Sequence, residues 1–152
     1  MTYLNRRTAL AGLGAMFLPS VTLAGDEEHR MVVTKTPSCG CCTAWAEIAR
    51  AEGFAVEIVE NADYVGTKRA HGVPDDLWSC HSTRVGGYVV EGHVPIEAVR
   101  RLLAERPDVA GIAVPGMPAG SPGMGDDPTA RFDVLSFGGA AEAGEVFYKA
   151  GE

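Results

Sequence analysis

The chain has 152 residues, of which 46% are hydrophobic and 22% are charged, and its formal net charge is −7. This length and composition suit one globular domain with its own hydrophobic core. The acidic balance argues against nucleic-acid binding, which needs a basic surface. Function is therefore expected to depend on particular side chains.

Residues 1–24 have the pattern of an export signal. Arg6 and Arg7 precede an apolar stretch, and Thr22-Leu23-Ala24 resembles a small-residue cleavage site. The paired arginines raise the twin-arginine route beside the general secretory route. An uncleaved anchor is the alternative, but the apolar stretch is shorter than the roughly 20 residues that span a bilayer. We expect a periplasmic protein with no stable membrane insertion after cleavage.

Residues 25–30 are a polar lead-in that we expect to be flexible, and a single domain follows over residues 31–152. Met31–Lys35 is rich in β-branched residues and predicts a strand. The stretch from Gly40 to Glu52 predicts a helix, and Phe54–Glu60 predicts a second strand. Because short loops join these elements, the two strands should be parallel, with a right-handed crossover.

The second half of the chain predicts shorter elements. We expect a helix within 61–70, a hairpin around Gly86-Gly87, a helix from Pro95 to Arg106, and final strands over 132–137 and 146–149. Residues 112–128 are rich in Gly and Pro and predict no regular element. They begin an extension over 112–152 that ends in a β-hairpin. The predicted fold class is α/β.

The stretch Cys39-Gly40-Cys41-Cys42 lies at the turn between the first strand and its helix. Cys39 and Cys42 form a Cys-x-x-Cys pair in a thioredoxin-like position, where the helix N-terminus lowers thiol pKa values. Cys41 adds a third sulfur that a dithiol oxidoreductase does not need. Three soft donors favour Cu(I) first and Zn(II) second. The alternative is a redox-only pair, with Cys41 packed as a small hydrophobic residue.

Five further candidates lie downstream. Cys80 and His81 begin the predicted hairpin, from which they can approach the helix terminus; otherwise Cys80 is buried or disulfide-bonded and His81 is exposed. His93 precedes a helix and either binds metal or satisfies backbone groups at a turn. Met117 and Met124 lie in a Gly/Pro-rich stretch with little core to fill, and thioethers select Cu(I). The carboxylates are scattered, and we interpret them as solvated surface.

Several short stretches occur together in the order Lys35-Thr-Pro-Ser-Cys-Gly-Cys-Cys42, Gly72-Val-Pro74, Ser79-Cys-His81, Gly86-Gly-Tyr-Val-Val-Glu-Gly-His-Val-Pro95, Leu103-Ala-Glu-Arg-Pro107, Ala113-Val-Pro-Gly-Met-Pro118 and Gly120-Ser-Pro-Gly-Met124. This combination resembles the CopG-type periplasmic copper-resistance proteins, a family long described only as a domain of unknown function. The resemblance implies a thioredoxin-like mixed sheet flanked by helices, with a C-terminal extension that helps to bind metal. It also implies a cysteine-bridged multicopper cluster and a role in copper redox interconversion during detoxification and efflux.

Under this copper-binding hypothesis the cysteines hold copper as thiolates, and a thioether or an imidazole completes the coordination. The expected metal ligands are Cys39, Cys41, Cys42, Cys80, Met117, Met124, His81 and His93, with Cys39 and Cys42 as catalytic residues. The expected partners are copper ions and periplasmic copper efflux or chaperone proteins. We expect a monomer that binds no nucleic acid.

Two other functions fit the same residues. One is a metal-free thiol–disulfide oxidoreductase with Cys39 as nucleophile and Cys42 as resolving thiol. The other is a non-catalytic chaperone that delivers Cu(I) to an efflux system. Ordinary thioredoxins place a cis-proline loop opposite the cysteine pair. The counterpart expected here, Ser79-Cys80-His81-Ser82, contains no proline, which favours metal binding over protein disulfide exchange.

Overall fold

The computed structural model describes residues 29–152. The predicted export segment 1–24 and residues 25–28 of the predicted lead-in lie outside the described residues. Strand β1 (Arg30–Lys35) begins one residue before the predicted start. Within residues 29–152, no helix combines the length and the apolar character needed to cross a membrane.

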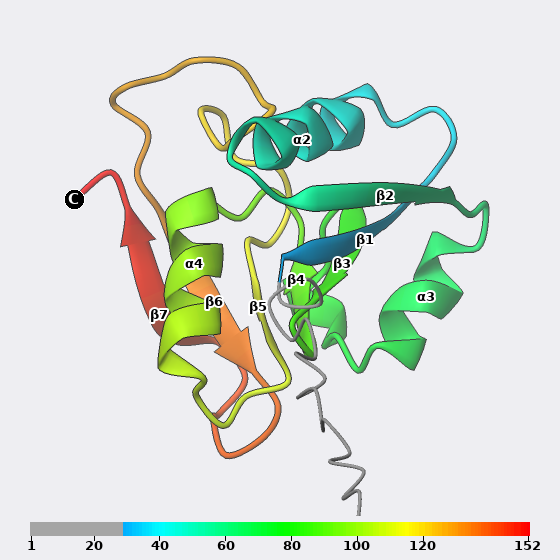
Figure 1. The fold of residues 1–152 in the computed structure, drawn as a ribbon. Coiled ribbons are helices and arrows are strands. Elements are labelled where there is room, and N and C mark those ends of the chain that lie inside the picture. Colours follow the sequence, from blue (N-terminus) through cyan, green and yellow to red (C-terminus); the bar gives the residue numbers. More distant parts are fainter. Residues whose placement is uncertain (1–28) are drawn as a thin grey trace, which may run out of the picture.

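The described residues form one mixed sheet of seven strands in the order β2-β1-β3-β4-β5-β6-β7 (Figure 1). Neighbouring strands are parallel in the pairs β1–β2 and β4–β5 and antiparallel in the other four pairs. The predicted α/β class is therefore confirmed. After β1, the strands are β2 (Ala55–Glu60), β3 (His81–Val85), β4 (Tyr88–Glu91), β5 (Gly111–Ala113), β6 (Phe132–Phe137) and β7 (Glu145–Ala150).

Helices cover both faces of the sheet. They are α2 (Gly40–Ala51), α3 (Tyr64–Ala70) and α4 (Ile96–Glu105), with a short 3-10 helix over Asp75–Leu77. The larger hydrophobic core joins α2 and α4 to one face, through residues such as Trp45 and Val90. The neighbouring Val89 belongs to a second core with Leu77 on the other face. Side chains alternate along a strand, so adjacent residues of β4 serve opposite cores.

The strand–helix–strand unit forms as the residue pattern predicts. In β1, Met31 and Val33 are fully buried, while Val32 between them is only partly buried. Helix α2 ends at Ala51 with Glu52 as its C-cap, and the next residue, Gly53, has a φ of +94°, a left-handed conformation that glycine adopts without strain. The chain then returns as β2, parallel to β1.

Two local predictions are corrected by the structure. Pro95 caps α4 with φ −57° and ψ 140°, so the first helical residue is Ile96. Strand β5 was not predicted, and it overlaps the stretch assigned as irregular. Its three residues are too short to show alternation, and all are buried. Gly111 sits so close to the carbonyl of Val89 that a Cβ would not fit.

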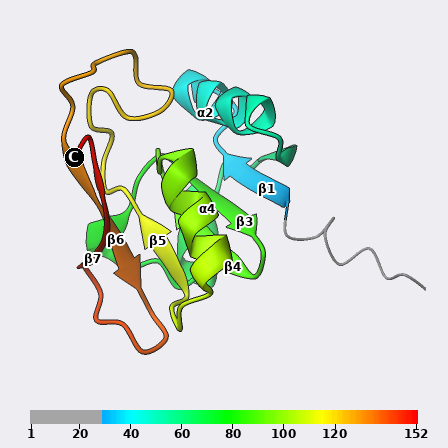
Figure 2. The same ribbon diagram turned by 60° about the vertical axis from the view of Figure 1, so that its left-hand side comes forward.

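The C-terminal extension continues the sheet and also returns to α2. Strands β6 and β7 form an antiparallel hairpin that pairs with β5. Between β5 and β6, the Gly/Pro-rich segment runs to the end of the molecule where α2 lies (Figure 2). At Gly123 a Cβ would meet the backbone of Cys41 and Trp45. The segment therefore packs directly on the first turns of α2, next to the cysteines.

Candidate metal centre

The cysteine turn is held in place by a buried lysine. Lys35, the last residue of β1, is 3% exposed. Its ammonium group donates hydrogen bonds to the carbonyl oxygens of Thr36 at 3.1 Å and Pro37 at 3.3 Å, and it lies 3.4 Å from the carboxylate of Glu60. Cys39 is the N-cap of α2, but its side chain makes no capping hydrogen bond. Its sulfur is therefore available for other chemistry.

A disulfide joins Cys39 to Cys42 across the first turn of α2, with their Cα atoms 5.5 Å apart. Cys41 and Cys80 are free cysteines. The sulfur of Cys41 lies 3.5 Å from that of Cys39. The structure thus presents the oxidised form of the Cys-x-x-Cys pair, and reduction would release two further sulfur ligands.

Strand pairing brings Cys80 to the cysteine turn. In the β1–β3 register Lys35 lies opposite His81, so Cys80 sits beside the end of β1 from which the cysteine turn departs. Its carbonyl oxygen is 3.8 Å from the sulfur of Cys42. The sulfur atoms of Cys39, Cys41, Cys42 and Cys80 all lie within 4.8 Å of one another. The fold therefore gathers all four cysteines of the chain into one cluster.

Burial raises the pKa of the Cys80 thiol to about 12, with a further contribution from the neighbouring Cys41. The thiol is therefore protonated at neutral pH. Metal binding requires the thiolate, so an ion that binds Cys80 must displace its proton.

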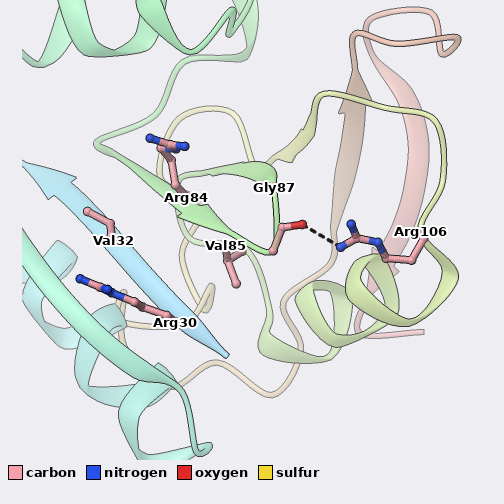
Figure 3. A pocket seen from close by; sticks show the side chains of 7 residues that line it. Arg30, Val32, Arg84, Val85, Gly87 and Arg106 are labelled. Carbon is pink, nitrogen blue, oxygen red and sulfur yellow. Dashed lines mark hydrogen bonds between the residues drawn. The ribbon is translucent and has the colours of Figure 1, made fainter. Parts of the chain in front are cut away.

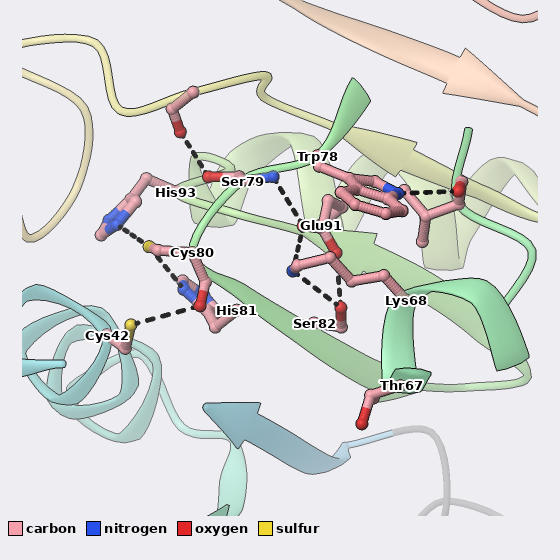
Figure 4. A network of polar contacts seen from close by, with 12 residues as sticks. Cys42, Thr67, Lys68, Trp78, Ser79, Cys80, His81, Ser82, Glu91 and His93 are labelled. Carbon is pink, nitrogen blue, oxygen red and sulfur yellow. Dashed lines mark hydrogen bonds and ion pairs between the residues drawn. The ribbon is translucent and has the colours of Figure 1, made fainter. Parts of the chain in front are cut away.

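Two imidazoles stand on the other side of the Cys80 sulfur (Figure 4). This sulfur is 2.9 Å from Nε2 of His93 and 3.5 Å from Nδ1 of His81. The ligand atoms of these three residues lie within 4.8 Å of one another. Both histidines are fully buried, so the alternative of an exposed His81 is wrong. The structure therefore brings both predicted histidines to the predicted cysteine site.

Both imidazoles are kept neutral. Burial lowers the pKa of His81 well below its ordinary value, with help from His93 and Lys68. Burial also lowers the pKa of His93, which a hydrogen bond to the carbonyl of Pro122 partly offsets. Neutral imidazole is the form that binds a metal ion.

Trp45 packs against His81 and links helix α2 to the segment that carries His93. Its ring packs against that of His81 with centroids 4.9 Å apart, and its Nε1 donates to the carbonyl of Val94 at 2.9 Å. Helix α2 is thereby tied to the segment that carries His93. Nε2 of His81 is buried and has no hydrogen-bond partner among the described residues.

The two predicted methionines lie at the edges of the site. Met117 is 53% exposed and lines a pocket of about 450 Å³ together with Cys80. The hydroxyl of Ser79 donates to the carbonyl of Gly116, which holds the Met117 loop beside Cys80. Met124 is partly buried and directly follows Gly123, which packs on α2.

Sequence reasoning missed a buried ion pair behind Cys80. Glu91 and Lys68 are 0% and 1% exposed, and their charged groups are 2.5 Å apart. Glu91 also accepts hydrogen bonds from the backbone N–H of Ser79 at 2.7 Å and from the hydroxyl of Ser82 at 2.5 Å (Figure 4). The interpretation of all carboxylates as solvated is therefore wrong for Glu91. Its place at the end of the apolar run Tyr88–Val90 was the available signal.

A separate pocket of about 380 Å³ has three arginines in its lining: Arg30, Arg84 and Arg106 (Figure 3). Arg106 donates to the carbonyl of Gly86 at 2.7 Å, and Arg30 lies 2.9 Å from the carboxylate of Glu57. Arg30 is the first residue of β1, whereas the cysteine turn follows the last. This pocket is therefore at the opposite end of the strand from the cysteines.

Comparison with known proteins agrees with this architecture. Residues 77–124 match the family described as "Protein of unknown function, DUF411". A solved structure described as "Copper resistance protein copG- Form 1" is 37% identical and covers 81% of this chain and 98% of its own, with a TM-score of 0.73. A second, "Copper resistance protein copG- Form 2", is 38% identical and covers 79% of this chain and 96% of its own, also with a TM-score of 0.73. No curated protein matches the chain.

Fold and site together define a mixed α/β protein with a cysteine-rich cluster suited to a soft metal ion. At this identity, over most of both chains, the protein belongs to the CopG family of copper resistance proteins.

Proposed function

We propose that this protein binds copper through Cys39, Cys41, Cys42 and Cys80 in the periplasm, and that it interconverts Cu(I) and Cu(II) in copper resistance. The observation that carries this proposal is the meeting of four sulfur atoms within 4.8 Å from two distant parts of the chain. Thiolates are soft ligands that select Cu(I). The names of the two solved relatives favour copper over zinc.

The Cys39–Cys42 pair is the proposed electron source. Closing the disulfide releases two electrons and two protons, and these electrons reduce two Cu(II) ions to Cu(I). The closed disulfide of the structure corresponds to the protein after this step. A dithiol reductant then restores the two thiols by disulfide exchange. Cys39 and Cys42 are catalytic in this sense, because they exchange electrons with the copper substrate.

A thiolate can bridge two metal ions, so four sulfurs at these distances suit a multinuclear copper cluster. Met117 and Met124 would add thioether ligands from the extension, which packs over the site at Gly123. The strand–helix–strand unit with a Cys-x-x-Cys pair at the helix N-terminus supports a thioredoxin-like description of the single domain 31–152, with residues 112–152 as its extension. Periplasmic copper efflux or chaperone proteins are the proposed partners of a monomer.

Metal stoichiometry tests the proposal. The mature protein is reduced, freed of reductant and loaded anaerobically with Cu(I), and copper per chain is measured. Cys39→Ser should lower the stoichiometry because it removes one of the four sulfurs. Met31→Leu is the matched control, since it removes a buried sulfur of β1 that lies in the hydrophobic core. Equal copper content in wild type and Cys39→Ser would remove Cys39 from the site.

The disulfide itself favours a second candidate, a metal-free thiol–disulfide oxidoreductase. This function predicts that the metal-free protein reduces a model protein disulfide such as insulin at a rate that copper does not change. The free thiol of Cys80 beside the pair argues against it, because a third thiol would compete with the incoming substrate. Electron paramagnetic resonance of bound copper during turnover separates redox conversion from simple Cu(I) delivery.

A further inference from the structure

Cys80 belongs to two groups of potential metal ligands. One is the four-cysteine group, and the other combines Cys80 with His81 and His93. We propose that the protein with a closed Cys39–Cys42 disulfide still binds one copper ion, through Cys80, His81 and His93. This inference rests on the proposed copper function and assigns a second, overlapping site to it. We call the three residues the imidazole site.

The geometry of the imidazole site is close to that of a bound ion. The Cys80 sulfur is 2.9 Å from Nε2 of His93 and 3.5 Å from Nδ1 of His81, and all three ligand atoms lie within 4.8 Å of one another. Bonds from a metal to nitrogen and sulfur are about 2.0–2.3 Å long. An ion placed among these atoms therefore requires side-chain adjustments of the order of an ångström rather than a change of fold.

Hydrogen bonding prepares His93 for this role. Its Nδ1 lies 2.7 Å from the carbonyl oxygen of Pro122, which can only accept, so Nδ1 carries the proton. The lone pair of Nε2 then faces the Cys80 sulfur, where it accepts from the thiol until a metal ion displaces that proton. A backbone carbonyl that fixes the tautomer and orientation of a histidine is the usual support for a metal ligand.

His81 presents its Nδ1 to the Cys80 sulfur at 3.5 Å. Its Nε2 is buried without a hydrogen bond within residues 29–152, and such an atom costs free energy. Only one of its two nitrogens carries a proton in the neutral ring. A metal ion bound at Nδ1 would leave the proton on Nε2, so the case for His81 as a ligand rests on the position of Nδ1, which lies 3.5 Å from the Cys80 sulfur.

The closed disulfide affects only one of the two groups. It withdraws Cys39 and Cys42 from the four-cysteine group and leaves the free thiols of Cys41 and Cys80. The imidazole site contains neither bonded cysteine, so its donor set stays complete. Because Cys80 is common to both groups, copper can pass between them without leaving this sulfur.

Donor chemistry distinguishes the two groups by the copper oxidation states that each can hold. Sites rich in thiolate favour Cu(I), whereas one thiolate with two imidazoles is the donor set of blue-copper sites, which hold Cu(II) as well as Cu(I). The reduced pair would thus accompany a sulfur-rich Cu(I) site. The oxidised pair would accompany the imidazole site.

Metal titration of the disulfide form tests the inference. The mature protein in its disulfide form is recognised by having only two alkylatable thiols per chain. It is titrated with Co(II), which thiols do not reduce, and separately with Cu(II). We expect one ion per chain, a near-ultraviolet thiolate-to-Co(II) band and a visible thiolate-to-Cu(II) band. His93→Gln and Cys80→Ser should lose both bands. His71→Gln should retain them, since this histidine lies at the end of α3.

A measurement on the unaltered protein guards against misfolded variants. Zn(II) added to the disulfide form should shift the imidazole nitrogen resonances of His81 and His93 and leave those of His71 in place. Absence of metal binding by the disulfide form would overturn the inference, as would bands that persist in both His93→Gln and Cys80→Ser. If the reduced protein from the same preparation binds Cu(I) while the disulfide form binds nothing, only the imidazole site fails. If neither form binds metal, the proposed function fails as well.

Discussion

Two polar clusters lie back to back where β3 begins and β4 ends, and they differ in how completely their groups are paired. In the first, Glu91 accepts from Lys68, Ser82 and the backbone of Ser79, so both oxygens of its carboxylate have hydrogen-bond partners. In the second, the Cys80 thiol is not in a disulfide, and Nε2 of His81 is buried with no hydrogen-bond partner among residues 29–152. The strand alternation that places Ser82 in one cluster places His81 in the other.

This difference separates a structural cluster from a reactive one. A buried charge that has all its partners holds the chain in one conformation and offers nothing to a ligand. The Cys80 thiol and the imidazole nitrogens that face it contact one another, so a metal ion can bind them by displacing the thiol proton. The Lys68–Glu91 pair therefore supports the segment that carries Cys80, and the proposed metal site lies on the opposite side of that segment.

The largest effect should come from the residue shared by both ligand groups. Cys80→Ser should abolish Co(II) binding by the disulfide form and lower Cu(I) stoichiometry in the reduced form, because it removes one ligand from each group. Stability should change little, since serine is nearly isosteric with cysteine. Metal analysis with thermal unfolding of the same samples measures both. Full metal binding by this variant would show that Cys80 is not a metal ligand, and it would contradict the assignment of this cluster as the reactive one.

Breaking the structural cluster should cost stability instead. Lys68→Met leaves the Glu91 carboxylate buried and unpaired, which should lower the free energy of unfolding by about 3–5 kcal/mol. Urea denaturation measures this loss. Lys149→Met is the control, because Lys149 makes an exposed ion pair with Glu152, and it should cost less than about 1 kcal/mol. A loss as small as that of the control would show that Lys68 does not stabilise the fold.

The reactive cluster should make the metal-free protein sensitive to acid. Burial lowers the pKa values of the two histidines of this cluster, His81 and His93, in the folded protein. The unfolded chain therefore binds more protons below about pH 6.5, and stability falls as the pH decreases below that value. Each histidine should contribute up to about 1.4 kcal/mol per pH unit. Denaturation at pH 7.5 and pH 5.5 measures the slope, which His93→Gln should reduce.

The smallest effect is expected at the edge of the site. Met117→Ala should weaken Cu(I) binding by about tenfold or less, equivalent to about 1.4 kcal/mol, because this side chain is half-exposed. Competition with a Cu(I) chelator measures the affinity. Ala119→Gly is a control change in the same segment. A change of stoichiometry in Met117→Ala, rather than of affinity, would make Met117 an essential ligand.

Local pattern was sufficient for most of the architecture. The run Met31–Lys35, the helix after Cys39 and the glycine that ends it are encoded by neighbouring residues, so their positions agree with the prediction. Strand β5 was not predicted, because three consecutive buried residues show no hydrophobic periodicity. The burial of Glu91 was not predicted, because a carboxylate is normally solvated and only the fold brings Lys68 to it.

The sequence by itself determined the kinds of donor atom and the local turn that presents them. Three cysteines at a strand-to-helix turn already specify soft, thiolate chemistry, since spacing and residue type are properties of adjacent positions. Only the tertiary structure decided that Cys80 stands between the sulfurs and two imidazoles. The register of β3 against β1 and the carbonyl of Pro122 set that arrangement, and both are contacts between residues far apart in the chain.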